Sequence, residues 1–334
     1  MKFLVVGLGS MGKRRIRNLQ HLGEKDIIGF DMKQERRDEA KQKYGIATVS
    51  TIHEGLAHKP AAMIISTPPN HHLEYERLAA DHGIHFFCEA SIFSAGLADL
   101  EKASKDIVAA PSVTMRFNES VIRIRDLVLR GAIGKVVAVT YHMGQYLPDW
   151  HPWEHITEFY AGQKETGATR EMVPFELQWL TWVLGPVAEL SCIKGKVSSL
   201  DADIDDVYQL VLRFEEGAIG NLLVEVISRT PLRILRIVGE EGTLVWDWLD
   251  DTVRVFDAKT KSWQMHAEQA GFKETGYLAK ENMYIEEIRA FLDAIHGKKP
   301  YPYTLAEDRA ILSLLIAAER AAANGKHELV EHSQ

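Results

Sequence analysis

A G-x-G-x-x-G pattern at residues 7–12 restricts the possible folds more than any other feature of the sequence. An apolar run at residues 3–6 precedes it and predicts a strand, and a helical stretch at residues 11–22 follows it. A bare glycine pattern arises easily by chance, but a strand before it and a helix after it form the context of a dinucleotide-binding βαβ unit. The N-terminal part of the chain is therefore predicted to be a Rossmann domain.

Each position of the pattern has a physical reason. Gly7 permits a tight turn, Gly9 lets the backbone approach a pyrophosphate, and Gly12 lets the helix pack closely against the strand. Unpaired N–H groups at the start of the helix would face the phosphates, so we expect Ser10 and Met11 to line the same site. The pattern thus predicts where the pyrophosphate of a dinucleotide binds.

An acidic residue completes this signature. Asp31 ends the next predicted strand, 19 residues after the last glycine, where its carboxylate can accept hydrogen bonds from ribose hydroxyls. The carboxylate would repel a 2′-phosphate, which favours NAD, and Met32 is expected beside it in the cofactor site. Lys33, Arg36 and Arg37 lie nearby and could neutralise a 2′-phosphate, so NADP stays possible.

The first 115 residues alternate strand and helix patterns. Alternating βαβ units imply a parallel sheet that helices cover on both faces, which places this part in the α/β class. Further strands are expected at residues 27–31, 62–66, 84–88 and 107–113, and further helices at residues 34–44 and 71–82.

The pattern changes after about residue 116. Consecutive strands joined by short turns indicate an antiparallel sheet. We therefore expect an NAD(P)-binding Rossmann domain at residues 1–116. Residues 117–334 are expected to form an α+β domain with a large, open, mostly antiparallel sheet that binds substrate and mediates oligomerisation. Its strands are expected at residues 136–145, 188–197, 207–214, 220–227, 235–238, 244–247 and 253–256, and its helices at residues 120–130, 174–184, 284–295 and 305–324.

Charge and cysteine content exclude several other classes of protein. The formal net charge is −8 and no clustered basic surplus appears, so nucleic acid is not an expected partner. No stretch approaches the roughly 20 apolar residues that a membrane span requires, and the N-terminal apolar run is too short for a signal peptide. The two cysteines are far apart in the sequence, which favours a reducing, cytoplasmic location.

Two motifs carry a resemblance to a known family. Residues 66–72 read Ser-Thr-Pro-Pro-Asn-His-His, and residues 83–89 read Gly-Ile-His-Phe-Phe-Cys-Glu. These motifs resemble the Gfo/Idh/MocA family, which includes glucose–fructose oxidoreductases, inositol dehydrogenases and sugar-nucleotide dehydrogenases. The similarity runs through essentially the whole chain. It implies an oxidoreductase with a sugar-type substrate and a homodimer or homotetramer formed through the C-terminal sheet. It also implies a cofactor site that includes Ser66, Thr67, Pro68, Asn70, His72 and Glu89.

The sequence departs from that family at two places. The usual Glu-Lys-Pro reads Glu-Ala-Ser at residues 89–91, so the catalytic lysine is absent. The usual Asp-x-Gly-x-His reads Glu-Met-Val-Pro-Phe at residues 171–175, which puts Glu171 in the place of the aspartate and Phe175 in that of the histidine. Neither Ala90 nor Phe175 can move a proton, so another group must do so if the protein is a dehydrogenase.

Two gatherings of polar and aromatic residues are candidates for a substrate site, at residues 144–155 and 170–176. Aromatic surfaces with a few hydrogen-bonding groups suit sugar rings. For proton transfer the candidates are Glu171 and His151, with His155 and Tyr146 behind them. The residues expected to bind substrate are Arg116, Gln145, Asp149, Trp150 and Arg170.

Structural interpretations of the same residues stay open. Glu171 can serve only as an acid at a helix N-terminus, and Arg170 can pair with a neighbouring acid. His151 and His155 fit the H-x-x-E-H pattern of a zinc protease. Pro152 allows at most the start of a helix there, so no metal is expected.

Three functions follow from these observations. The first is an NAD(P)-dependent oxidoreductase that transfers a hydride between the nicotinamide and a carbinol or carbonyl of a sugar, amino sugar or nucleotide sugar. The second is a glycosidase or lyase that uses NAD as a transient oxidant. The third is a non-catalytic dinucleotide-binding sensor, which the loss of the lysine and histidine motivates.

Overall fold

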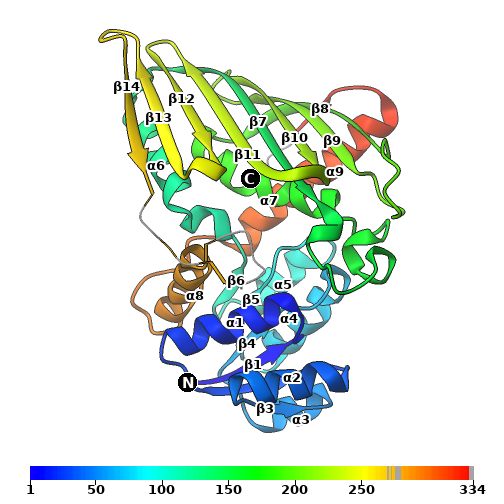
Figure 1. Cartoon of the computed structure of the whole chain (residues 1–334). Coiled ribbons are helices and arrows are strands. Elements are labelled where there is room, and N and C mark those ends of the chain that lie inside the picture. Colours follow the sequence, from blue (N-terminus) through cyan, green and yellow to red (C-terminus); the bar gives the residue numbers. More distant parts are fainter. Residues whose placement is uncertain (269–270, 272, 275–279, 331–334) are drawn as a thin grey trace. The chain divides into compact units, whose positions relative to one another are not determined.

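The computed structural model describes residues 1–268, 271, 273–274 and 280–330 of the 334-residue chain. Its contacts divide the chain into two compact units (Figure 1). The first unit comprises Met1–Phe117 and Gly271–Arg309, and the second comprises Asn118–Ala270 and Ala310–Gln334. The break after Phe117 lies next to the boundary expected at residue 116. Residues 271–309, however, group with the first unit, whereas the sequence assigned them to the second.

A six-stranded parallel sheet forms the centre of the first unit. Its strand order, β3-β2-β1-β4-β5-β6, is that of a Rossmann domain, so the predicted α/β class is confirmed. The order reverses between β1 and β4, and sheets of this kind bind ligands at the carboxyl ends of the strands at such a reversal. The strands are β1 (Lys2–Val6), β2 (Asp26–Phe30), β3 (Ala47–Val49), β4 (Ala62–Ile65), β5 (His85–Cys88) and β6 (Ala109–Pro111).

Helices pack around this sheet and complete its core. Phe3 and Ile64 are fully buried, and they share a hydrophobic cluster with Ile288 and Phe291 from α8. The rings of Phe87 and Phe291 lie 6.0 Å apart. These contacts are the physical reason why the late segment joins the first unit. The helices are α1 (Ser10–His21), α2 (Gln34–Tyr44), α3 (Ile52–Ala57), α4 (His72–Asp81), α5 (Leu97–Ala103) and α8 (Asn282–Ile295).

A nine-stranded sheet dominates the second unit. Its order is β14-β13-β12-β11-β7-β10-β9-β8-β15. Among these described strands, β7 and β10 pair in parallel and the other neighbours pair antiparallel. The predicted large, mostly antiparallel sheet is thus confirmed. The strands are β7 (Val136–Tyr146), β8 (Val187–Gly195), β9 (Val207–Phe214), β10 (Ile219–Glu225), β11 (Ile227–Gly239), β12 (Gly242–Asp247), β13 (Thr252–Asp257), β14 (Ser262–Ala267) and β15 (Glu328–Leu329).

The two faces of this sheet differ. On β7 the side chains of Val139, Tyr141 and Met143 are buried, while the alternate residues Ala138 and Thr140 are exposed, as the period of two in a strand requires. The buried face packs against helices that include α6 (Glu119–Leu129) and α7 (Ala168–Leu184) (Figure 1). The opposite face carries exposed apolar side chains, among them Ile193, Val211, Ile219, Ile234, Trp263 and Met265.

Two element boundaries differ clearly from the expected ones. Helix α7 begins at Ala168, whereas the sequence placed its start at Pro174, a residue type that favours the first turn of a helix. Strand β11 extends from Ile227, whereas the sequence predicted residues 235–238. Its early part contains Pro231, which cannot donate a ladder hydrogen bond, and the register shifts between Ile227 and Leu232.

Several short elements were not predicted: β3, α3, α5, β14 and β15. One of them had a readable signal. The Thr51 hydroxyl accepts a hydrogen bond from the Glu54 N–H, and the Glu54 carboxylate accepts one from the Thr51 N–H, which is a capping box at the start of α3. The T-x-x-E spacing alone would have predicted this helix.

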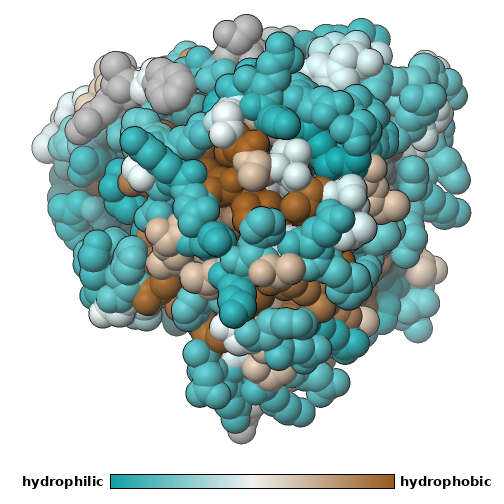
Figure 2. All heavy atoms as spheres, turned by 90° about the horizontal axis from the view of Figure 1, so that it is seen from below, coloured by the Kyte–Doolittle hydropathy of each residue, from teal (hydrophilic) through white to brown (hydrophobic). Residues whose placement is uncertain are grey.

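Hydrophilic side chains dominate the face in Figure 2, with hydrophobic ones visible between them. None of the described helices combines the length and apolar character needed to cross a membrane. Over the same residues, no three His, Cys, Asp or Glu side chains are grouped as metal ligands would be.

A buried carboxyl group in the first unit gives a prediction for stability against pH. Burial raises the pKa of Glu76 to about 7 from 4.5, and Cys88 and Asp308 lie beside it. The folded state therefore binds more protons than the unfolded state between these values, so the contribution of Glu76 to stability falls as the pH rises through this window. The free energy of unfolding is measured by urea denaturation at pH 5 and pH 8 for the wild type and Glu76→Gln. Raising the pH is expected to change this free energy in favour of the variant, relative to the wild type, by about 3 kcal/mol. An identical pH dependence for both proteins would refute this.

Candidate active site

The glycine pattern forms the turn between β1 and α1. Gly7 has a φ of +88°, and a Cβ there would lie 2.5 Å from the carbonyl oxygen of Ser66. A Cβ on Gly12 would lie 1.8 Å from the carbonyl oxygen of Gly7. The turn can therefore approach β4, and the helix can approach the turn, only because both residues lack side chains.

Gly9 has open space instead. A Cβ on Gly9 would have no neighbour closer than Nη1 of Arg36, at 3.6 Å. Within the described part of the chain, no side chain caps α1 and no acid lies in its first turn, which begins with Ser10 and Met11. Open space before uncapped helix N–H groups is what a pyrophosphate needs, so these residues fit a dinucleotide.

Asp31 is held at the carboxyl end of β2. Its Oδ2 accepts a hydrogen bond from the Leu8 N–H at 2.8 Å, and its Oδ1 accepts one from the Lys33 N–H at 2.9 Å. Nη1 of Arg36 lies 3.6 Å from Oδ2. The guanidinium of Arg37 donates to the backbone carbonyls of Asp31 and Met32. The carboxylate and the nearest cation thus sit side by side where the adenosine ribose is expected.

This arrangement predicts how cofactor preference can be changed. Asp31→Asn keeps an acceptor for the Leu8 N–H but removes the charge that would repel a 2′-phosphate, and it leaves Arg36 unopposed. The ratio of NADP to NAD affinity is expected to rise roughly tenfold or more. Fluorescence titration with NADH and NADPH measures it. The exposed neighbour Glu35 supplies the control, Glu35→Gln, which should leave the ratio unchanged.

The segment after β4 holds two buried polar atoms that the described residues leave without a partner. The ring of His72 contacts the Thr67 carbonyl oxygen through Nε2 at 2.9 Å, and burial lowers the pKa of His72 to about 4. Nε2 is therefore the donor, and Nδ1 is left as an acceptor. Nδ1 of His72 and Oγ1 of Thr67 are both buried without a hydrogen-bond partner in this part of the chain. Such groups are costly unless something binds them, so they fit a ligand. Pro68 is half-buried, whereas Asn70 and Met32 are exposed.

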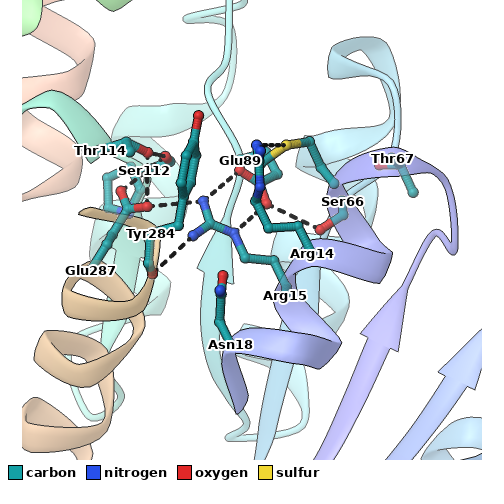
Figure 3. Close-up of polar contacts among 12 residues, drawn as sticks. Arg14, Arg15, Asn18, Ser66, Thr67, Glu89, Ser112, Thr114, Tyr284 and Glu287 are labelled. Atoms are coloured by element: carbon teal, nitrogen blue, oxygen red, sulfur yellow. Dashed lines mark hydrogen bonds and ion pairs between the residues drawn. The ribbon is translucent and has the colours of Figure 1, made fainter. Parts of the chain in front are cut away.

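Glu89, which follows β5, is fixed by a buried arginine. Arg15 donates from Nε to Oε1 at 2.7 Å and from Nη2 to Oε2 at 2.8 Å (Figure 3). The hydroxyl of Ser66 also donates to Oε1, at 3.2 Å. The carboxylate of Glu89 thus lies at the carboxyl ends of the strands, with its position set by α1 and by the segment after β4.

Arg15 bridges two carboxylates. Its Nη2 lies 2.9 Å from Oε2 of Glu287, which also accepts hydrogen bonds from Ser112 and Thr114 (Figure 3). Burial disfavours the charged form of Arg15, but Glu89 and Glu287 more than offset this and raise the pKa of the guanidinium above its ordinary value. The arginine therefore stays charged inside the first unit.

In the second unit, a series of side-chain contacts connects the two polar gatherings. Glu171 lies in the first turn of α7, and the Tyr160 hydroxyl donates to its Oε2 at 3.1 Å and its Oε1 at 3.3 Å. The Tyr160 ring packs edge-on against Phe159 at 4.7 Å, and Phe159 stacks on His151 at 3.9 Å. Two aromatic rings thus connect the two leading candidates for proton transfer.

The two histidines of this segment differ in their surroundings. His151 donates from Nδ1 to the Glu154 carboxylate and stacks between Trp153 and Phe159. His155 is 59% exposed, and its Nδ1 lies 2.8 Å from the Thr157 hydroxyl. The geometry therefore gives His151 a fixed ring and leaves His155 at the surface.

The other predicted residues of this strand and loop are spread out. The ring of Tyr146, at the end of β7, lies 3.7 Å from the Arg229 guanidinium. Gln145 is half-buried and Asp149 is exposed. Trp150 packs against a cluster built around Leu147, Phe159 and Ala168, and its buried Nε1 has no partner among the described residues. Their role in substrate binding stays a prediction.

Arg170 and Arg116, the two arginines expected to bind substrate, each form contacts within their own unit. Nε of Arg170 lies 2.6 Å from Oε1 of Glu319 in α9 (Leu305–Asn324). This is the pairing with a neighbouring acid that the sequence left open. Nη1 of Arg116 donates to the Pro302 carbonyl at 3.2 Å and to Glu307 at 3.3 Å. Glu176 in the second gathering is fully buried and accepts hydrogen bonds from Tyr141, Trp179 and Arg233.

Sequence reasoning missed the partners of the carboxylates. Tyr160 and Phe159 lie outside both gatherings, and no pattern connects them to Glu171. Arg15 was visible as part of a basic run in a predicted helix, where charged residues usually face solvent. Its pairing with Glu287 joins residues 272 positions apart, so no local signal could predict it.

The sheet order, the glycine turn and Asp31 define the first unit as a dinucleotide-binding Rossmann domain, joined in the chain to an open-sheet α+β unit. Family models agree. Residues 1–110 match the oxidoreductase family with an NAD-binding Rossmann fold, and residues 121–245 match the GFO/IDH/MocA C-terminal domain. The chain belongs to the Gfo/Idh/MocA family of NAD-binding oxidoreductases, which confirms the resemblance drawn from its motifs.

Individual relatives are distant. Levoglucosan dehydrogenase of Pseudarthrobacter phenanthrenivorans is 22% identical over 244 residues, which is 63% of this chain and 62% of that protein. The match therefore spans less than two thirds of that relative. A structure of levoglucosan dehydrogenase with NADH and levoglucosan has a TM-score of 0.87 at 17% identity, with 100% of both chains covered. An oxidoreductase from Agrobacterium radiobacter, in complex with NAD+, L-tartaric acid and magnesium, has a TM-score of 0.88 at 15% identity over 99% of this chain and 98% of its own.

Proposed function

We propose that the protein is an NAD-dependent dehydrogenase that transfers a hydride between the nicotinamide and a carbinol or carbonyl of a sugar, amino sugar or nucleotide sugar. The observation that carries the proposal is Glu171 at the start of α7, in the place of the family's aspartate, with the Tyr160 hydroxyl on its carboxylate. The naming of a distant relative as levoglucosan dehydrogenase supports a sugar-type substrate.

In the proposed reaction, a side chain of this protein accepts the hydroxyl proton of the substrate. When bound, NAD+ provides the nicotinamide ring as the hydride acceptor. A Glu171 carboxylate oxygen takes the hydroxyl proton as the O–H bond of the carbinol breaks. The C–H electron pair leaves with the hydride, so the carbinol becomes a carbonyl. The missing lysine and histidine are then not needed, because one positioned base and good orientation of the carbinol supply most of the rate.

An exposed aromatic side chain in the segment that carries His151 suits a sugar. Trp153 is 66% exposed and stacks on His151. Aromatic faces bind the apolar faces of sugar rings, while nearby carboxylates and amides bind their hydroxyls. We assign Gln145, Asp149 and Trp150 to substrate binding on this basis.

A substrate screen tests the proposal. Purified protein is incubated with NAD+ or NADP+ and a panel of polyols, sugars and nucleotide sugars, and absorbance at 340 nm and the thermal midpoint are recorded. We expect NADH formation with at least one compound, which should also raise the midpoint. Product formation without net NADH would point to transient redox in a glycosidase or lyase. Cofactor binding without any turnover would point to a sensor.

We also propose a cytoplasmic homodimer or homotetramer that forms through the open face of the large sheet. Exposed apolar side chains on several strands of that face, such as Ile193, Trp263 and Met265, support it, because contiguous apolar surface usually marks an interface. Light scattering of the purified protein measures the subunit number.

A further inference from the structure

Tyr160 belongs to none of the residue sets expected for the site. It opens the short 3₁₀ turn Tyr160–Gly162, which precedes α7, and its hydroxyl reaches both carboxylate oxygens of Glu171. A phenol that donates to a carboxylate stabilises its ionised form, which is the form that accepts a proton.

The turn that carries Tyr160 is fixed by its neighbours. The Thr166 hydroxyl donates to the Tyr160 carbonyl at 2.5 Å, and the Gly162 N–H donates to the Phe159 carbonyl at 3.0 Å. A Cβ on Gly162 would lie 2.1 Å from the Ile156 carbonyl oxygen, so the turn packs closely on the preceding one. Phe159 is 8% exposed and belongs to a hydrophobic cluster. The phenol therefore projects from a rigid support.

We propose that Tyr160 is a positioning residue for Glu171: its phenol holds the carboxylate in one orientation and in the ionised state, ready to take the proton of the carbinol. This inference rests on the proposed function, since it assigns Tyr160 to the same site.

The charges around the pair agree with that role. The N-terminal end of α7 favours a negative charge at Glu171. The neighbouring Arg170 carries a positive charge, but its guanidinium pairs with Glu319 and with the Glu165 carbonyl. The Tyr160 hydroxyl donates a hydrogen bond directly to the Glu171 carboxylate, whereas the Arg170 guanidinium is directed to other groups.

The first test compares kinetics. Tyr160→Phe removes only the hydroxyl, and Tyr44→Phe, in α2 of the first unit, removes a phenol hydroxyl elsewhere. With the substrate found in the screen, Tyr160→Phe should lower kcat at least tenfold, which is the effect of losing one hydrogen bond to a charged group, while KM stays within about threefold. The acidic limb of the kcat–pH profile should move to higher pH. A profile and kcat equal to those of Tyr44→Phe would overturn the inference, because a structural role alone moves no titration.

A second measurement needs no turnover. With 13Cζ-tyrosine labelling, the pH at which the Tyr160 phenol ionises is followed by NMR in the wild type and in Glu171→Gln. The carboxylate should hold that ionisation at a higher pH in the wild type. An unchanged Tyr160 titration would overturn the inference. If the screen finds no substrate, the proposed function fails by itself, and this titration alone decides whether Tyr160 controls Glu171.

Discussion

Glu171→Gln is expected to lower kcat for NAD+-dependent oxidation by about a thousandfold, within the range that general-base catalysis contributes. The amide keeps the size of the carboxylate and can still accept from the Tyr160 hydroxyl, but it cannot take a proton. Affinity for NADH should be unchanged, because the dinucleotide is assigned to the first unit. Steady-state absorbance at 340 nm and fluorescence titration give the two quantities.

The matched control is Glu165→Gln, which removes a charge from an exposed side chain six residues earlier in the chain. It should retain full activity. If Glu171→Gln kept more than about a tenth of the wild-type kcat, the base would have to be another group. His151, held by Glu154 and two rings, would then be the next candidate.

Arg15→Met is expected to destabilise the protein by about 3–5 kcal/mol, the cost of leaving buried charges unpaired. The guanidinium lies between the carboxylates of Glu89 and Glu287 and also covers the Phe87 ring at 4.4 Å. Methionine fills part of the same space but neutralises neither acid. Urea denaturation followed by circular dichroism measures the loss.

Two further variants separate charge from packing. Lys13 lies on the same helix as Arg15, and Lys13→Met removes its ion pair with Glu39 of α2; such surface pairs contribute less than about 1 kcal/mol. Adding Glu287→Gln to Arg15→Met should restore part of the stability, since one unpaired charge disappears. A double variant no more stable than Arg15→Met would mean that packing, and not the buried charge, dominates.

The helices and strands that could be predicted from the sequence are those whose signal lies within a short stretch of residues. β1 and α1 follow from an apolar run, a glycine turn and helical spacing within about 20 residues. Long strands of the second unit were found in the same way. β11 was cut short because Pro231 and the polar residues near it resemble a loop, although the strand continues through a change of register. The parallel pairing of β7 with β10 depends on partners far apart in the chain, so nothing local indicates it.

The residues of the candidate site also differ in whether a local sequence signal predicts them. Gly7, Gly9, Gly12 and Asp31 each meet a backbone or charge requirement that can be recognised in a single sequence. The structure gives a steric reason for Gly7 and Gly12 and leaves open space at Gly9. Glu171 was a candidate only through its place in a family motif. The Tyr160 hydroxyl, which fixes the Glu171 carboxylate, comes from a separate turn. This hydrogen bond depends on the folded positions of that turn and of α7, so it could not be predicted from the sequence.

Titration of NADH into the wild type and into Gly9→Ala tests the central claim most directly. A Cβ on Gly9 has room in the protein, so the variant should keep the wild-type thermal midpoint, but it would occupy the space of the pyrophosphate. We expect the wild type to bind NADH and Gly9→Ala to bind it at least about tenfold more weakly, a difference of 1.4 kcal/mol. Equal affinities, or no binding of NADH or NADPH by the wild type, would contradict the account.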